Sequence, residues 1–198
     1  MTDEKQAIDA AVEQFRSLME SQLARAKRIR EDKEFTDFDA LDTIVIGICG
    51  GDGIGPVITK ESERVLSFLL KDEVASGKIR FKEIDGLTIE NRAAHMKAIP
   101  DDVLAELKAC HVILKGPTTT PRAGDEWPNI ESANVAMRKE LDLFANVRPV
   151  KVPEEGIDWT FFRENTEGAY TLGSCGFETE DGISVDFTST TTDGTQRI

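Results

Sequence analysis

Residues 43–56, with the sequence TIVIGICGGDGIGP, decide the fold. The first seven of them, 43–49, form a continuous apolar run, which is typical of a parallel strand buried on both faces. A glycine turn occupies residues 50–56, and apolar residues then recur at helical spacing over residues 57–70. The stretch therefore predicts a buried strand, a tight turn and a helix.

The chain continues to alternate between strand and helix patterns. We expect strands at residues 78–84 and 111–115, and between them a helix at residues 100–110 that begins at a proline. Residues 159–163 and 183–192 then form β-rich segments of aromatic and β-branched residues. This order predicts an α/β fold with a largely parallel sheet and flanking helices, followed by the start of a smaller, β-richer domain.

Three regions are expected along the chain. Residues 1–40 form an N-terminal helical extension, because apolar residues recur at helical spacing from about residue 3 to residue 33. Residues 41–150 form the N-terminal part of a large α/β domain, and residues 151–198 begin the smaller domain. The extension is expected to pack on the main body or on a second subunit.

The charge balance argues against two classes of partner. The 198 residues include 24 Lys and Arg against 37 Asp and Glu, for a formal net charge of -13. Such a surface repels nucleic-acid phosphates and anionic membranes, and no apolar run approaches the ~20 residues of a spanning helix. We therefore expect no nucleic-acid or membrane partner, and an anion could bind only where basic residues converge.

Cysteine and histidine usage predicts no metal centre of the zinc or haem type. Cys49, Cys110 and Cys175 are far apart, and the only histidines are His95 and His111. An odd number of dispersed cysteines, together with a polar and acidic N-terminus, predicts a cytoplasmic protein.

The glycine turn at residues 50–56 allows two interpretations. A glycine-rich loop between a strand and a helix is the setting of a phosphate site. However, Asp52 occupies a glycine slot of the GxGxxG pattern counted from Gly50, and its carboxylate would repel phosphate. The residues alone favour a tight structural turn that only glycine can form.

Residues 115–121, KGPTTTP, follow a predicted strand at the position where ligands bind in open α/β sheets. Three hydroxyls held between two prolines can bind a ligand. Each hydroxyl can equally cap a helix or satisfy the backbone of its own loop. Both interpretations are open for Thr118, Thr119 and Thr120.

Three arginines point to a carboxylate ligand. Arg138 lies in a helical segment entered through Ser132 and Asn134, whereas Arg148 and Arg163 interrupt apolar surroundings, where an unpaired guanidinium is costly. Arginine binds carboxylates through two parallel hydrogen bonds. Internal partners are available at Glu140, Asp142, Glu164 and Glu167. Three arginines beside a threonine loop nevertheless favour a site for a small polycarboxylate.

The only tyrosine, Tyr170, closes the segment RENTEGAY at residues 163–170. A phenol near an arginine cluster can act as a general acid, because neighbouring cations lower its pKa. The alternative is an aromatic core residue whose hydroxyl has a hydrogen-bond partner.

Four ordered motifs resemble the β-decarboxylating dehydrogenases, the family of isocitrate, isopropylmalate, homoisocitrate and tartrate dehydrogenases. The motifs are GGDGIGP, LKGPTTTP, SANVAMRKELDLFANVRP and FRENTEGAY, and the resemblance extends from about residue 44 to residue 198. It implies the isocitrate/isopropylmalate dehydrogenase fold, which is not a Rossmann fold, and a mainly structural glycine turn.

The resemblance also implies roles for individual residues. The substrate-binding residues would be Ser132, Asn134, Arg138, Arg148, Arg163 and Thr120. The cofactor, NAD or NADP, would be contacted by Thr119, Thr120 and Asn134. Tyr170 would be the catalytic acid that protonates the enolate after carbon dioxide leaves.

The implied reaction is hydride transfer from a secondary alcohol to NAD(P)+, followed by decarboxylation on Mg2+ or Mn2+. Isopropylmalate enzymes carry an apolar, leucine-containing patch around the position of Ser132, whereas residues 130–135 here are IESANV. Isocitrate, converted to 2-oxoglutarate, is therefore the expected substrate. Paired subunits complete each active site in the family, which implies a homodimer.

Several parts of the family's active site have no counterpart in this sequence. They are the catalytic lysine, the metal-ligating aspartates and the adenosine-binding loop, so no metal ligand is expected in this chain. We expect the N-terminal, substrate-binding part of an isocitrate dehydrogenase, inactive alone. The alternative is a non-catalytic regulatory or binding subunit that keeps the carboxylate clamp.

Overall fold

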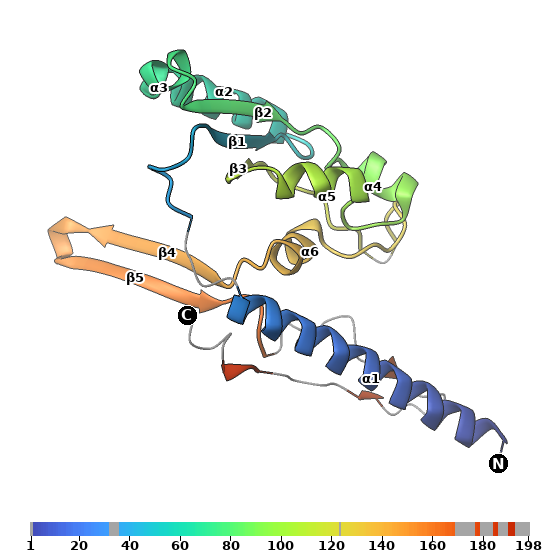
Figure 1. The fold of residues 1–198 in the computed structure, drawn as a ribbon. Helices are drawn as coiled ribbons and strands as arrows, with labels where there is room; N and C mark the ends of the chain where they lie inside the picture. Colours follow the sequence, from blue (N-terminus) through green and yellow to red (C-terminus); the bar gives the residue numbers. More distant parts are fainter. Residues whose placement is uncertain are drawn as a thin grey trace. The chain divides into compact units, whose positions relative to one another are not determined.

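The computed structural model describes residues 2–31, 36–122, 124–168, 177–178, 184–185 and 190–192. The chain divides into two compact units (Figure 1). One, here called the central unit, is Thr36–Leu141, and the other, the terminal unit, combines Met1–Phe35 with Asp142–Ile198. The domain division expected at residues 40 and 150 stays a prediction.

A parallel sheet lies at the centre of the central unit, in the strand order β2-β1-β3. Strand β1 (Ile44–Cys49) lies between β2 (Ile79–Glu83) and β3 (Val112–Lys115), and its residues 45–49 are buried. The apolar run of the sequence is thus the middle strand, which confirms the α/β fold with a parallel sheet and flanking helices.

Five helices accompany this sheet: α2 (Gly55–Leu69), α3 (Lys71–Ala75), α4 (Ile89–His95), α5 (Asp101–Lys108) and α6 (Ala133–Glu140). Residues of α5 and α6 form the core with Cys49 of β1 and with Ile84 and Leu87, which follow β2. The sequence predicts α2, α5 and α6. It does not predict α3 or α4, because five and seven residues are too few to show a helical period.

The terminal unit contains the long helix α1 (Thr2–Glu31), which agrees with the helix expected at residues 3–33. Strands β4 (Ala145–Val152) and β5 (Ile157–Glu164) pair in antiparallel fashion and are joined through the 3-10 turn η1 (Pro153–Glu155) and Gly156 (Figure 1). The two-residue strands β6 (Phe177–Glu178) and β7 (Ser184–Val185) also pair.

Two strand expectations for this unit need correction. Strand β4 is missed by the sequence, because Arg148 and Pro149 interrupt the apolar alternation at its centre, although a two-stranded ladder tolerates a proline. Of the β segment expected at residues 183–192, residues 184–185 are strand β7, whereas 190–192 lie outside any strand. The remaining residues of that segment lie outside the described residues.

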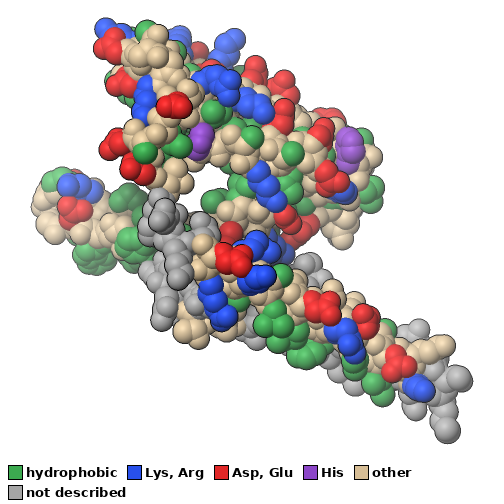
Figure 2. All heavy atoms as spheres, in the orientation of Figure 1, with side chains coloured by type: hydrophobic (Ala, Val, Ile, Leu, Met, Phe, Trp, Pro, Cys, Tyr) green, Lys and Arg blue, Asp and Glu red, His purple; other side chains and the backbone are tan. Residues whose placement is uncertain are grey.

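Apolar side chains are exposed along two elements of the terminal unit (Figure 2). On α1 they are Ile8, Val12, Phe15, Met19 and Leu23, and on the β4–β5 hairpin they are Val147, Val150, Trp159, Phe161 and Phe162. Among the helices of the described residues, none combines the length and the apolar content needed to cross a membrane.

Candidate functional site

The glycine turn after β1 contacts the threonine loop after β3. The Asp52 N–H donates to the carbonyl oxygen of Pro117 at 2.8 Å. The Asp52 carboxylate accepts the N–H of Thr119 on Oδ2 at 2.6 Å and the N–H of Ile89 on Oδ1 at 2.7 Å. Asp52 stands where the GxGxxG pattern has a glycine, and its carboxylate binds two backbone N–H groups. This agrees with a structural role for the turn.

Close backbone approach requires glycine at two positions of this contact. Gly51 has φ of 72°, and a Cβ there would collide with the carbonyl oxygen of Pro117. A Cβ on Gly116 would collide with the carbonyl oxygen of Gly50. The two loops can therefore approach each other only without these side chains.

Arg92 connects the threonine loop to the segment that enters α6. Its side chain is fully buried and donates to three carbonyl oxygens: Nε to Ala98 at 2.8 Å, Nη1 to Thr119 at 2.8 Å and Nη2 to Glu131 at 3.1 Å. Burial lowers the pKa of the Arg92 guanidinium, and the nearby Asp52 carboxylate opposes that shift. Sequence reasoning missed Arg92, because its acceptors are backbone carbonyl oxygens, and these leave no recognisable pattern of side chains in the sequence.

The three threonines of the loop have different surroundings. The Thr118 hydroxyl accepts a hydrogen bond from Lys115 Nζ at 3.0 Å, so it serves the loop itself. Burial lowers the pKa of Lys115. The hydroxyls of Thr119 and Thr120 make no hydrogen bond to other described residues, and Thr120 is exposed. The Thr120 side chain is therefore accessible to a ligand, whereas Thr119 is half-buried.

Helix α6 and its N-cap residue carry three of the predicted residues of the central unit. Ser132 is its N-cap residue, but the Ser132 side chain makes no capping hydrogen bond. Asn134 and Arg138 are four residues apart and hence lie on one face of the helix, while Ala136 and Met137 are buried on the other. The helix thus presents an amide and a guanidinium side by side.

The β4–β5 hairpin brings together two of the predicted arginines. Its register pairs Asn146 with Arg163 and Arg148 with Phe161, so both arginines lie on the same face of the ladder. Arg148 Nε donates to Asn146 Oδ1 at 2.8 Å. Asn146 is a polar residue between the two arginines that sequence reasoning missed, although a strand period of two would have placed it there.

The neighbours of Arg148 and Arg163 are apolar, as expected, but they do not bury the two arginines. Both arginines are exposed, and so are their aromatic neighbours Phe161 and Phe162, at 52% and 61%. The reason is that, among the described residues, the ladder has two strands, and no further strand of the same sheet covers the aromatic residues of β5.

The four acidic residues expected as internal partners contact other groups. Glu140 pairs with Lys108, whereas Asp142 and Glu167 pair with Arg25. Glu164 Oε1 accepts the N–H of Glu167. Each of these acids therefore has a partner other than the three predicted arginines.

The predicted residues are divided between the two units. Thr119, Thr120, Ser132, Asn134 and Arg138 belong to the central unit, and Arg148 and Arg163 to the terminal unit. Tyr170 lies outside the described residues. Within the described ranges, no group of three or more His, Cys, Asp or Glu side chains could hold a metal ion, so these residues do not fit the Mg2+ or Mn2+ that the resemblance implies.

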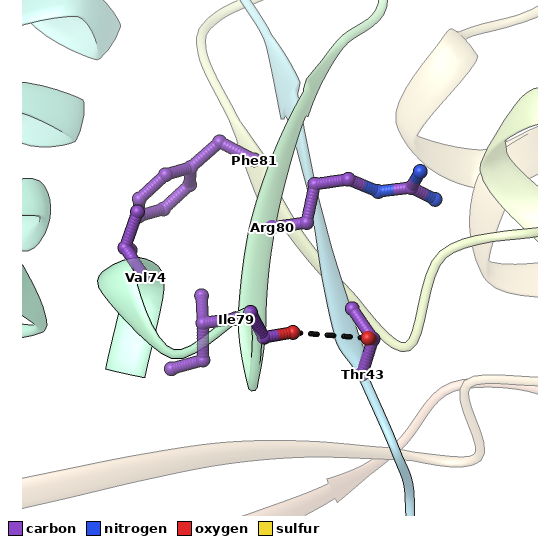
Figure 3. Close-up of a pocket in the computed structure, with 6 residues that line it drawn as sticks. Thr43, Val74, Ile79, Arg80 and Phe81 are labelled. Atoms are coloured by element: carbon purple, nitrogen blue, oxygen red, sulfur yellow. Dashed lines mark hydrogen bonds between the residues drawn. The ribbon is translucent and has the colours of Figure 1, made fainter. Parts of the chain in front are cut away.

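Two cavities of the central unit differ from the expected carboxylate site. One of about 570 Å3 lies at the amino ends of β1 and β2, where the Thr43 hydroxyl donates to the carbonyl oxygen of Gly77 at 3.0 Å (Figure 3). The other, of about 360 Å3, adjoins the glycine turn. Its charged lining residues are Lys60, Glu63, Glu83 and Asp85, an acidic set that disfavours a bound anion.

Comparisons with known proteins agree with this architecture. The family model described as isocitrate/isopropylmalate dehydrogenase matches residues 45–198. An NADP isocitrate dehydrogenase of Caldococcus noboribetus is 36% identical over 148 residues, which are 65% of this chain and 31% of the relative. The mitochondrial regulatory subunit 3 of an NAD isocitrate dehydrogenase of Arabidopsis thaliana is 35% identical, over 61% of this chain and 30% of that subunit.

A solved structure gives the same assignment. The apo form of a β-decarboxylating dehydrogenase from Thermococcus kodakarensis superposes with a TM-score of 0.56 at 30% identity, over 78% of this chain and 43% of that one. The chain spans about a third of the length of the curated relatives it matches. On its motifs, its parallel sheet and these matches, the chain belongs to the isocitrate/isopropylmalate dehydrogenase family.

Proposed function

We propose that this chain is the substrate-binding part of an NAD(P)-dependent dehydrogenase that oxidatively decarboxylates isocitrate to 2-oxoglutarate. The observation that carries the proposal is the shared face of Arg148 and Arg163, with Asn146 between them. In a chain with a net charge of -13, two exposed arginines on one hairpin face are a local exception that suits a polyanion.

The proposed roles follow from the chemistry of each side chain. Arg138, Arg148 and Arg163 bind substrate carboxylates through paired N–H donors, and they neutralise charge that the acidic surface would otherwise repel. The Ser132 hydroxyl makes no helix-capping hydrogen bond. It hydrogen-bonds the substrate, as does the Asn134 amide. This polar contact favours a carboxylate over an alkyl group.

The residues proposed to contact the cofactor are Thr119, Thr120 and Asn134. Their fit rests on the exposed side chains of Thr120 and Asn134, on the half-buried Thr119 hydroxyl and on the fixed Thr119 peptide. Bound NAD(P)+ supplies the hydride acceptor. The Asp52 and Arg92 contacts hold the loop in one conformation before the cofactor binds, which lowers the entropic cost of binding.

Tyr170 is proposed as the group that donates a proton to the enolate of the product. The phenol lies seven residues after Arg163 in the sequence. Positive charge on neighbouring arginines would lower its pKa and make it a better acid near neutral pH.

Reduction of the nicotinamide cofactor tests the proposal. The protein as made by its native host is incubated with isocitrate, Mg2+ and either NAD+ or NADP+. We expect one equivalent of reduced cofactor per 2-oxoglutarate, and loss of both products in Arg148→Met and Arg163→Met but not in Arg80→Met, whose side chain is exposed on β2. Absence of reduction with both cofactors contradicts the proposal.

The choice of substrate within the family has its own test. The ratio of kcat/KM for isocitrate to that for 3-isopropylmalate should exceed one by at least about tenfold, because Ser132 offers a hydroxyl where an alkyl group would need an apolar contact. Homoisocitrate and tartrate are the remaining alternatives. A ratio below one would show that an isopropylmalate enzyme is the better assignment.

A second candidate is a non-catalytic subunit that binds isocitrate and regulates a partner. The similarity to a regulatory subunit favours it. The discriminating result is saturable binding of isocitrate without cofactor reduction. The catalytic proposal requires both binding and turnover.

We also propose a cytoplasmic location and a homodimer. Cys49 and Cys110 are free thiols, which suits the reducing cytoplasm. The exposed aromatic residues of the β4–β5 hairpin suit contact with a second copy in a homodimer. The net negative charge argues against nucleic-acid and membrane partners.

A further inference from the structure

Helix α1 contributes a buried cation to the terminal unit. The Arg25 side chain is only 11% exposed, whereas those of Arg16 and Lys27 on the same helix are 63% and 76% exposed. The helix precedes residues 45–198, the part that the family model matches. Arg25 is therefore an addition to the family motifs, and its partners show what it does.

Four hydrogen bonds join Arg25 to three side chains. Nε and Nη2 donate to Asp142 Oδ1 at 3.1 and 2.8 Å, and Nη2 also donates to Thr166 Oγ1 at 3.0 Å. Nη1 donates to Glu167 Oε1. Burial alone lowers the pKa of Arg25, but the bonds to Glu167 and Asp142 outweigh burial, so the pKa is raised.

Glu167 carries this network further along the chain. Its carboxylate also accepts the N–H of Thr191 at 2.7 Å and the Thr191 hydroxyl at 3.1 Å. The Glu167 side chain is 3% exposed. A carboxylate so deeply buried requires a cation, and Arg25 supplies it.

The partners of Arg25 lie at both strand ends of the β4–β5 hairpin. Asp142 is three residues before β4, and Thr166 is two residues after β5. The Asn165 N–H donates to the carbonyl oxygen of Phe144 at 3.0 Å beside them. Arg25 therefore bridges the two chain segments at the open end of the hairpin.

The open end is also where the arginine pair is located. The ladder begins with Ala145 opposite Glu164, and the next pair is Asn146 opposite Arg163. A two-stranded ladder is marginally stable by itself, so the twist and spacing at its end depend on the contacts made there. A change at Arg25 should consequently be felt first at Asn146 and Arg163.

We propose that Arg25 of helix α1 is a positioning residue, which holds the open end of the β4–β5 hairpin so that Arg148 and Arg163 bind substrate carboxylates at one fixed spacing. The proposal rests on the proposed function for its substrate. It assigns to the N-terminal helix a part in substrate binding without contact to the substrate.

Steady-state kinetics on the protein as made by its native host separate positioning from a general role in folding. The variant Arg25→Met leaves two carboxylates without their cation, and Arg25→Lys keeps the charge but loses the planar donor set. Arg28→Met is the matched control, an exposed arginine one turn further along α1. Asp142→Asn serves if Arg25→Met fails to fold.

The expected result is a split between KM and kcat. Arg25→Met should raise KM for isocitrate at least tenfold and lower kcat less than threefold, with Arg25→Lys in between and Asp142→Asn raising KM about threefold. Arg28→Met should match the parent. A fall in kcat at unchanged KM in Arg25→Met and Asp142→Asn indicates only a smaller folded fraction and overturns the proposal.

Amide hydrogen exchange tests the contact independently of catalysis. The Asn165 amide should exchange at least tenfold faster in Arg25→Met than in the parent or in Arg28→Met. If the parent does not oxidise isocitrate but this acceleration is seen, the proposed function is wrong and the positioning role stands. Equal Asn165 exchange in Arg25→Met and Arg28→Met refutes the positioning role, whatever the activity.

Discussion

The buried guanidinium of Arg92 donates a hydrogen bond from Nη1 to the carbonyl oxygen of Thr119 at 2.8 Å. The N–H of the same threonine donates to Asp52 Oδ2 at 2.6 Å. Both backbone groups of Thr119 are therefore held by charged side chains from elements far away in the sequence. A residue proposed to contact substrate and cofactor is thereby preorganised by the scaffold.

Replacing Arg92 by methionine should destabilise the central unit by about 3 kcal/mol or more. The change leaves three partly buried carbonyl oxygens without their donor, and each unsatisfied group costs about 1–3 kcal/mol when it is buried. Urea unfolding monitored by circular dichroism gives the measurement. Arg80→Met, at an exposed position of β2, should change stability by less than about 0.5 kcal/mol. Equal effects of the two substitutions would disprove the structural role of Arg92.

Asp52→Asn should reduce the free energy of unfolding by about 2 kcal/mol. The asparagine side chain has one acceptor oxygen and one donor nitrogen. It can therefore accept only one of the Ile89 and Thr119 N–H groups, and its own NH2 group faces the other. Asp101→Asn is the control, since the Asp101 side chain is 82% exposed in its pair with Lys97 and should cost less than about 1 kcal/mol. If Asp52→Asn is as mild as this control, the two backbone bonds do not stabilise the turn.

Alanine substitutions at Gly51 and Gly53 should differ strongly in effect. Both glycines have positive φ, of 72° and 59°, so each substitution carries a backbone penalty of about 1–2 kcal/mol. At Gly51 the added Cβ also collides with Pro117, whereas at Gly53 it meets nothing within 4 Å. Thermal unfolding should show a loss at Gly51→Ala of at least about twice that at Gly53→Ala. Similar losses would mean that the turn and the threonine loop are not in contact.

Cys49 should resist alkylation in the folded protein. It is fully buried, and burial raises the pKa of the Cys49 thiol to about 11. At pH 8 only about one thiol in a thousand is then ionised, and reactivity should rise only as the pH approaches 11. Iodoacetamide labelling with peptide mass spectrometry should find Cys49 unmodified in buffer and modified in guanidinium chloride. Rapid labelling of folded protein at pH 8 would contradict its buried position.

The sequence predicts the central sheet well because its signals are local. The apolar run at residues 43–49 and the glycine turn at 50–56 each specify one element through neighbouring residues alone. Arg92 shows the limit of such reasoning, since its three acceptors lie 6, 27 and 39 residues away and are backbone atoms. No pattern of side chains records them.

The candidate site was predictable in its residue types but not in its surroundings. Arginine chemistry and motif order select Arg138, Arg148 and Arg163 without a structure. The exposure of Arg148 and Arg163 depends instead on how many strands the ladder has, which is a tertiary property. The role of Arg25 also needed the structure, because it lies 117 residues from Asp142 and 142 from Glu167.

Calorimetric titration of isocitrate into the parent protein, Arg148→Met, Arg163→Met and the control Arg80→Met tests the central claim most directly. Loss of one charge-assisted, two-bond contact to a carboxylate costs about 2 kcal/mol or more, so the Kd should rise at least about 30-fold in each of the first two variants. The control should bind like the parent. An unchanged Kd in Arg148→Met and Arg163→Met would contradict the assignment of the hairpin face as a carboxylate site.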